Sequence, residues 1–161
     1  MPFSYFSKNF NLQIMKNLVF LLLFSVTLVS CDKKQIYHEY ENDLPEKRWK
    51  ESDVKTYEFE ITETDKTCNV IIEISNVLGT EMNVFPVDLK ITKPDGSVSL
   101  QLAEIKLNDK DCLGDICDEK VIVLEKFKFV KGKYKIEVSP KSKFGFVPNI
   151  IGVGLSVEIK E

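Results

Sequence analysis

The chain has 161 residues, of which 22 are Lys or Arg and 25 are Asp or Glu, so its formal net charge is −3, and 43% of its residues are hydrophobic. This length and composition fit one globular domain with enough apolar residues to bury a core. The acidic balance predicts no nucleic-acid partner, and the interspersed charges predict no polybasic lipid-binding patch.

The first 30 residues have the parts of a bacterial lipoprotein signal peptide in the right order. Lys16 supplies a positive charge, an apolar stretch follows over 18–29, and Leu28-Val29-Ser30-Cys31 has the pattern of a lipoprotein cleavage site. The apolar stretch of about 12 residues is shorter than the roughly 20 that a permanent membrane-spanning helix needs. We therefore predict that residues 1–30 are removed and that Cys31 carries the lipid.

A lipid on Cys31 places the protein in the cell envelope. Each buried CH₂ contributes about 0.8 kcal/mol, so several acyl chains anchor a protein stably to a membrane. Residues 32–35 lack the acidic run that often follows the lipidated cysteine of surface-exported lipoproteins, which favours a domain that faces the periplasm. Residues 1–14 precede Met15, which opens a complete signal peptide by itself, and we interpret them as an upstream extension.

Residues 31–45 are polar and end in the breaker Asn42-Asp43-Leu44-Pro45, which predicts a tether between lipid and domain. Beyond it, apolar and polar residues alternate with the period of half-buried strands. This alternation recurs over 57–61, 70–74, 87–91, 98–102, 127–129 and 134–138, and a last apolar strand follows over 150–159. Turn residues separate these segments, so the sequence predicts one all-β domain over 46–161, an antiparallel β-sandwich of immunoglobulin-like or jelly-roll-like type.

Three cysteines remain once Cys31 is assigned to lipid. Cys112 and Cys117 flank a short polar loop, which can close as a disulfide if the two side chains face each other, or can leave two free thiols. Cys68 lies in a predicted strand, where we expect it to be free and buried.

The residues give no support for catalysis, for a metal or for a cofactor. The acidic segment 109–119 has Leu113 and Lys120 where a calcium loop needs oxygen ligands, so we interpret it as a solvated loop. His38 is the single histidine and lies in the predicted tether, so no rigid element holds a Ser-His or Cys-His pair. We therefore predict that the protein is not an enzyme.

Three aromatic residues are candidates for partner binding. Trp49 lies among charged residues and either contacts a partner or fills one end of the sandwich. Phe144 and Phe146 lie in a segment where polar residues are usual, and they either form a binding surface or cover a sheet edge.

The later half of the chain resembles the GldH family of gliding-motility lipoproteins. The resemblance rests on short motifs, with Trp49 and Asn76 at suitable places: Leu102-Ala103-Glu104, Gly114-Asp115-Ile116, Phe127-Lys128-Phe129, Gly132-Lys133-Tyr134-Lys135-Ile136 and Pro148-Asn149-Ile150-Ile151-Gly152-Val153-Gly154-Leu155. The chain departs from the family pattern at Lys141-Ser142-Lys143 and in its two loop cysteines.

The resemblance implies a membrane-anchored accessory component of the gliding-motility machinery and of its associated secretion system. Its implied partners are other envelope proteins of that machinery, and it transfers a defined role only to Cys31. Two routes to a protein partner follow from a β-sandwich, strand addition at an exposed edge or docking of the aromatic loop. The alternative is a lipoprotein binding module for glycan or peptide, with Trp49, Phe144 and Phe146 as a stacking platform.

Overall fold

Antiparallel strands pair into three sheets over residues 35–63 and 66–160, which are the residues that the structure, a computed structural model, describes. The predicted signal peptide and Cys31 lie outside the described residues. The unit Lys34–Glu161 is therefore treated by itself. No helix in the described part of the chain is both long and apolar enough to span a bilayer.

The larger sheet has five strands in the order β1-β11-β4-β8-β7. Their bounds are Gln35–Glu41 for β1, Ile150–Ile159 for β11, Lys66–Val77 for β4, Ile116–Phe129 for β8 and Cys112–Leu113 for β7. The second sheet has the order β3-β9-β5-β6, and β2 pairs with β10 in a short ribbon. Their bounds are Lys55–Ile61 for β3, Gly132–Pro140 for β9, Val84–Thr92 for β5, Val98–Lys106 for β6, Arg48–Lys50 for β2 and Phe146–Pro148 for β10. A 3₁₀ turn over Pro45–Lys47 precedes β2.

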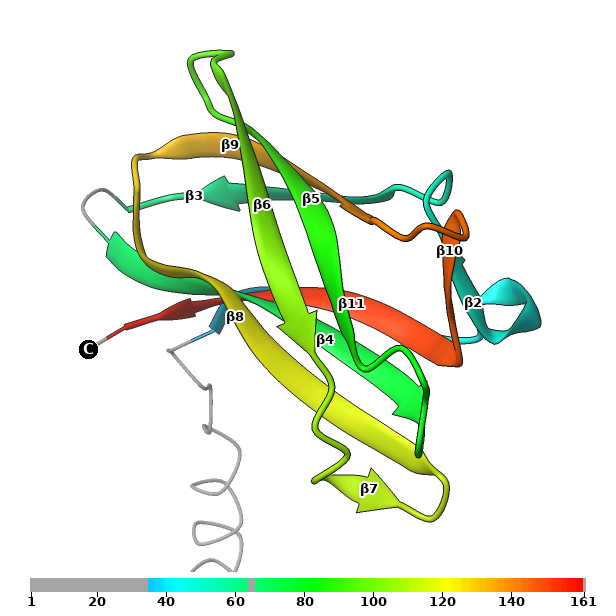
Figure 1. Ribbon diagram of the computed structural model, residues 1–161. Helices are drawn as coiled ribbons and strands as arrows, with labels where there is room; N and C mark the ends of the chain where they lie inside the picture. Colours follow the sequence, from blue (N-terminus) through cyan, green and yellow to red (C-terminus); the bar gives the residue numbers. More distant parts are fainter. Residues whose placement is uncertain (1–34, 64–65, 161) are drawn as a thin grey trace, which may run out of the picture. The chain divides into compact units, whose positions relative to one another are not determined.

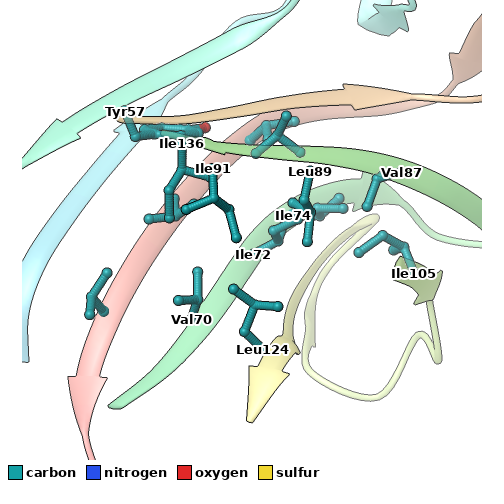
Figure 2. Close-up of a cluster of buried hydrophobic side chains, with 14 of the residues drawn as sticks. Tyr57, Val70, Ile72, Ile74, Val87, Leu89, Ile91, Ile105, Leu124 and Ile136 are labelled. Carbon is teal, nitrogen blue, oxygen red and sulfur yellow. The ribbon is translucent and has the colours of Figure 1, made fainter. Parts of the chain in front are cut away.

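The two larger sheets pack face to face, as Figure 1 shows. Val70, Ile72 and Ile74 of β4 point into the same core as Leu89 and Ile91 of β5, and each of these side chains is at most 1% exposed (Figure 2). Full burial of an aliphatic side chain contributes about 1.5–3 kcal/mol relative to exposure. The predicted all-β class with antiparallel sheets packed in one domain is confirmed.

An aromatic cluster closes the core where β3, β8 and β9 meet. The ring of Phe59 lies 5.8 Å from the rings of both Phe129 and Tyr134, centroid to centroid, and Tyr37 of β1 stacks on Phe59 at 5.0 Å. These contacts join the first strand to the second sheet, because Phe59 belongs to β3 and Tyr37 to β1.

The predicted tether over 31–45 is wrong from residue 35 onward, because Gln35–Glu41 form an edge strand. β1 pairs with β11 from Gln35↔Glu158 to Glu41↔Val153. Its sequence is polar because an edge strand exposes much of its surface, so a polar composition did not exclude a strand here. The β-sandwich therefore begins eleven residues earlier than residue 46, and His38 lies in a strand rather than in a tether.

The predicted alternation is inverted in β6. The expectation for 98–102 was a strand with its apolar residues inside, yet Val98, Leu100 and Leu102 are 53%, 76% and 70% exposed. Leu100 pairs with Lys90 and Leu102 with Asp88, so both leucines lie on the outer face of the sheet together with charged residues of β5. The pattern of a strand gives its period, but it does not say which face is buried.

Candidate functional site

The disulfide candidates meet in the hairpin that joins β7 to β8. In the structure Cys112 and Cys117 are joined as a disulfide and are directly paired across the hairpin. The turn between them has Gly114 at φ +63°, a backbone conformation that favours glycine. Cys68 is free and buried, and burial raises the pKa of its thiol, which keeps the thiol protonated and unreactive at neutral pH.

The acidic segment 109–119, which contains this hairpin, is tied to β4. Asn76 is fully buried, and its side-chain amide donates to the carboxylate of Asp109 at 3.0 Å, while the Gly79 backbone N–H donates to the other oxygen of Asp109 at 3.0 Å. The carboxylate of Glu119 accepts the backbone N–H of Asn108 at 2.7 Å. The carboxylates of Asp109 and Glu119 thus accept hydrogen bonds from N–H groups of the protein. Among the described residues, no group of three or more His, Cys, Asp or Glu side chains is placed to hold a metal ion.

Trp49 lies in the core, so its candidacy for partner binding is wrong. Its side chain is 0% exposed, its indole N–H donates to the backbone oxygen of Asp53 at 3.0 Å, and its ring lies edge-on to Phe85 at 6.5 Å. It fills one end of the sandwich beneath the β2–β10 ribbon, where it is paired with the equally buried Val147. A stacking platform of three aromatic rings is therefore not available to a glycan or a peptide.

Phe144 and Phe146 do lie side by side near the surface. Their ring centroids are 6.5 Å apart, and Phe144 is 59% exposed. The guanidinium of Arg48 lies 4.8 Å from the centre of the Phe146 ring, and the ammonium of Lys143 lies 4.9 Å from that of Phe144. Each ring thus already has a cation of the same chain on one face, at a distance where cation–π attraction is significant.

The apolar stripe of β6, formed by Val98, Leu100 and Leu102, was not singled out from the sequence as a site. β6 is the last strand of its sheet, so its outer edge has unpaired backbone groups. Its residues 98–103 carry no charge, although Glu104 and Lys106 follow in the same strand, whereas the edge strand β1 contains Glu39 and Glu41 and the edge strand β3 exposes Glu58 and Glu60. Natural proteins place charges on sheet edges to prevent strand pairing. An uncharged edge segment with exposed leucines therefore resembles the sheet edges to which an extended peptide adds as a further strand.

A shallow groove of about 560 Å³ lies beside this stripe on the outer face of the second sheet. Leu100 and Leu102 of β6 line one side of the groove and Val54, just before β3, lines the other, while the Lys90–Glu137 ion pair at 2.8 Å lies on the two strands between them. The hydrogen bond from Lys90 lowers the pKa of Glu137 and keeps it ionised at neutral pH. The groove thus presents apolar side chains on both sides of a pair of opposite charges.

The outer face of the larger sheet carries a polar cluster. The hydroxyl of Tyr40 donates to Ser75 Oγ, which in turn donates to Asp118, and His38 Nε2 lies 3.3 Å from a carboxylate oxygen of Glu73. Ser75 is thus bound to Asp118 and not to the histidine, so these residues do not form a nucleophile–base pair.

Comparison with known proteins shows the family to which the chain belongs. The family model of the GldH lipoprotein matches residues 35–157, which is nearly the whole described domain. The chain belongs to the GldH lipoprotein family. Its membership makes it a lipoprotein anchored to a membrane of the cell envelope, in a family of motility lipoproteins rather than of enzymes.

Two relatives of the GldH family extend this result along the chain. The gliding motility lipoprotein GldH of Flavobacterium johnsoniae is 27% identical over 159 residues, covering 91% of this chain and 98% of the relative. A GldH homologue of Christiangramia forsetii is 27% identical over 128 residues, covering 74% of this chain and 77% of the relative.

Solved structures are only distantly similar to this GldH-family domain. A serine protease of Aeromonas sobria is 13% identical with a TM-score of 0.36, over 78% of this chain and 27% of the protease. The latent PorU of Porphyromonas gingivalis is 7% identical with a TM-score of 0.35, over 79% of this chain and 13% of PorU. Likenesses of this size carry no argument about function.

Proposed function

We propose that this protein is an accessory component of the gliding-motility machinery and its associated secretion system, and that the edge of β6 accepts an extended strand of another envelope protein of that machinery. Lipid on Cys31 holds the domain at the membrane, facing the periplasm. The observation that carries the proposal is the exposure of Val98, Leu100 and Leu102 along the uncharged residues 98–103 of an edge strand. The motility name of the relative from F. johnsoniae supports the choice of a machinery protein as the partner.

Strand addition suits the chemistry of this edge. Backbone hydrogen bonds supply affinity without regard to sequence, and pockets for alternate side chains supply specificity. The stripe and its groove offer such contacts on one face, where a partner strand with apolar residues at every second position would cover Leu100 and Leu102.

A charge on the stripe tests the proposal in cells. Leu100→Lys should abolish colony spreading and adhesin movement when it replaces the native gene, because a desolvated ammonium opposes strand addition. Its matched control is Leu113→Lys, which places the same charge on another exposed leucine, 90% exposed in the β7–β8 hairpin. Spreading of the Leu100→Lys strain at the rate of the control, with equal protein levels, would contradict the docking edge.

The partner itself is identified by crosslinking from the same position. A photoreactive amino acid at residue 100 should crosslink to one envelope protein in wild-type cells, and the same group at residue 113 should not. Deletion of the gene tests the broader role, because normal gliding of the deletion strain would overturn the assignment to the machinery. A crosslink only to a second copy of this chain would replace the machinery partner by self-association.

A further inference from the structure

The turn between β8 and β9 gathers lysines at one end of the molecule. The segment Lys126-Phe127-Lys128-Phe129-Val130-Lys131-Gly132-Lys133 contains four lysines and no acidic residue. All four lysine side chains are exposed, and Val130 at the turn is 56% exposed. This segment, the lysine turn, corrects the expectation that the chain has no polybasic patch.

The lysines of this turn form no ion pair in the described part of the chain. Among residues 35–63 and 66–160, no ion pair within 4.0 Å involves any of the four lysines of the turn; Glu125 is paired with Lys160 at 2.7 Å and Glu63 with Lys66 at 2.8 Å. The acidic side chains next to the turn are Glu125, which is bound to Lys160, and Glu60, which is the cross-strand neighbour of Lys133 but forms no ion pair with it.

The charges are separated along β8. This strand of 14 residues runs from the acidic segment 109–119 at one end to the lysine turn at the other. At about 3.3 Å per residue it spans roughly 46 Å, which is several Debye lengths at physiological salt. The lysine turn is therefore electrostatically separate from the acidic segment at the other end of β8.

Strand register places the lysine turn at the end of the domain where β1 begins. Gln35 pairs with Glu158, Glu158 pairs with Asn69, and the side chain of Asn69 accepts the backbone N–H of Lys126 at 3.0 Å. β8 then continues past this row, pairing Phe129 with Lys66 before the chain turns into β9. Figure 1 shows the β8–β9 turn on the same side of the domain as the end of β11.

The length of chain between Cys31 and β1 limits how far a lipid on Cys31 can be from this end. Cys31 precedes Gln35 by four residues, and a chain spans at most about 3.6 Å per residue, so Cys31 stays within roughly 14 Å of the start of β1. The lysine turn extends past the row of Gln35 by a similar length, because about four residues separate Lys126 from its tip. A membrane that holds the lipid is thus within reach of the turn.

We infer that the lysine turn lies against anionic lipid headgroups of the membrane that carries the anchor, with Val130 entering the headgroup layer. This inference rests on the lipid at Cys31 in the proposed function. Lysines near an anionic surface act additively, at about fivefold in membrane affinity each, and an exposed apolar residue at the tip suits the interface between headgroups and water. The contact fixes which end of the domain faces the membrane and leaves β6 accessible along its side.

The test uses the lipidated full chain in vesicles of phosphatidylcholine with or without 30% phosphatidylglycerol. Val130→Cys carries a fluorophore on an exposed thiol, because Cys68 is buried and Cys112 and Cys117 are bonded to each other. Val84→Cys, 48% exposed at the start of β5, is the control. A quencher on the lipid headgroups should quench the label at residue 130 at least threefold more in anionic than in neutral vesicles, and should leave the label at residue 84 unchanged.

A charge variant separates this contact from a general effect of the anchor. Replacing Lys128, Lys131 and Lys133 by Gln should remove the preference for anionic vesicles, whereas the same replacement at Lys106, Lys141 and Lys143 should keep it. Equal melting curves confirm that both triple variants fold. A chain that floats with the vesicles but shows no preference at residue 130 overturns the inference and leaves the anchor intact. A chain that does not float overturns the anchor at Cys31, and the inference falls with it.

Discussion

Gly152 and Gly154 of β11 lie where a side chain would collide with β1. A Cβ atom on Gly152 would lie 2.3 Å from the hydroxyl oxygen of Tyr40, and one on Gly154 would lie 2.4 Å from its ring and 2.8 Å from the backbone oxygen of Glu39. The two glycines thus form a slot in which the ring of Tyr40 lies flat on the sheet, and its hydroxyl reaches Ser75. The glycines are required by this close approach rather than by a turn.

Gly154→Ala should lower the free energy of unfolding by about 1–3 kcal/mol, because the backbone of β1 must move to make room for the methyl group. Denaturant unfolding of the variant measures the loss. Combining it with Tyr40→Ala should recover part of the loss, since the nearest atom is removed while the contact with Glu39 remains. An unfolding midpoint equal to that of the wild type would show that β1 is not held this closely.

The disulfide of the β7–β8 hairpin should contribute about 2 kcal/mol to stability, because it closes a loop of only six residues and the chain-entropy gain grows with loop length. Intact-mass measurement without reductant should show the protein two hydrogens lighter than its thiol form. The double variant Cys112→Ser, Cys117→Ser should be less stable by that amount and insensitive to reductant. Alkylation of either cysteine in the unreduced, native protein would disprove the pairing.

Glu73 gives the domain a defined sensitivity to acid. Its partial burial would raise the pKa of its carboxyl, but the nearby hydroxyl of Ser156 and the charge of Lys120, whose ammonium lies 3.3 Å from the carboxylate, outweigh burial and lower it. A carboxyl whose pKa is lower in the folded than in the unfolded state stabilises the fold above the unfolded pKa of about 4.3, and this contribution is lost as the pH falls through the folded value. Glu73→Gln should therefore lose less stability than the wild type between pH 5 and 3, as measured by thermal melting across that range. Glu104→Gln controls for the loss of one carboxylate from an exposed strand position, and an identical acid response of wild type and Glu73→Gln would refute the role of Glu73.

Among the strands, the edge strands β1 and β6 are the two that differ from the prediction made from the sequence. β5 shows why most strands were predictable, since Phe85, Val87, Leu89 and Ile91 are all at most 1% exposed and alternate with residues of the outer face. β6 has the same alternation but lies at the edge, where its apolar residues project outward, and the chain alone cannot say which neighbours a strand will have. β1 was missed because its partner β11 is more than a hundred residues away in the sequence.

The outward orientation of the β6 leucines predicts that their substitution has little effect on stability. Leu100→Ser should change the free energy of unfolding by no more than about 0.5 kcal/mol, because 76% of the side chain is already in water. Leu89→Ala on the adjacent strand should cost about 2–5 kcal/mol, because that side chain is 1% exposed in the core. Comparable losses for the two variants, measured by urea unfolding, would mean that the leucines of β6 face inward.

The position of the candidate surface residues also depends on which strands pair, and the sequence does not reveal that pairing. Trp49 was ambiguous in the sequence because charged neighbours on either side alternate with it in β2, and only its register with Val147 places it inside. The lysine turn was present in the sequence as four lysines within eight residues. The membrane contact that we infer for it depends on its position at the end of the domain where β1 begins, and that position comes from pairing across four strands.

At the scale of the whole molecule, the shortness of the link between Cys31 and β1 has a consequence for function. With only residues 32–34 between the proposed lipid and the first strand, the domain cannot move far from the membrane surface, so a partner at the β6 edge must be reached close to that surface. Inserting a flexible Gly/Ser segment of 20 residues after Lys34 allows a root-mean-square separation of about 25 Å. The insertion should therefore weaken the crosslink from residue 100 to its partner, if that partner's strand is held at a fixed height above the membrane.

Fractionation of cells tests the anchor on which this geometry depends. Cys31→Ala should move the protein from the membrane fraction to the soluble fraction, because the remaining domain carries no acyl chains and the lysine turn alone binds weakly and reversibly. Cys68→Ala is the matched control, since it removes a buried cysteine and should leave the protein in the membrane fraction. Washing at high salt distinguishes the two attachments, because salt screens the lysines but does not extract acyl chains. Salt-resistant membrane retention of Cys31→Ala would place the anchor elsewhere in the chain, and the orientation inferred for the lysine turn would lose its basis.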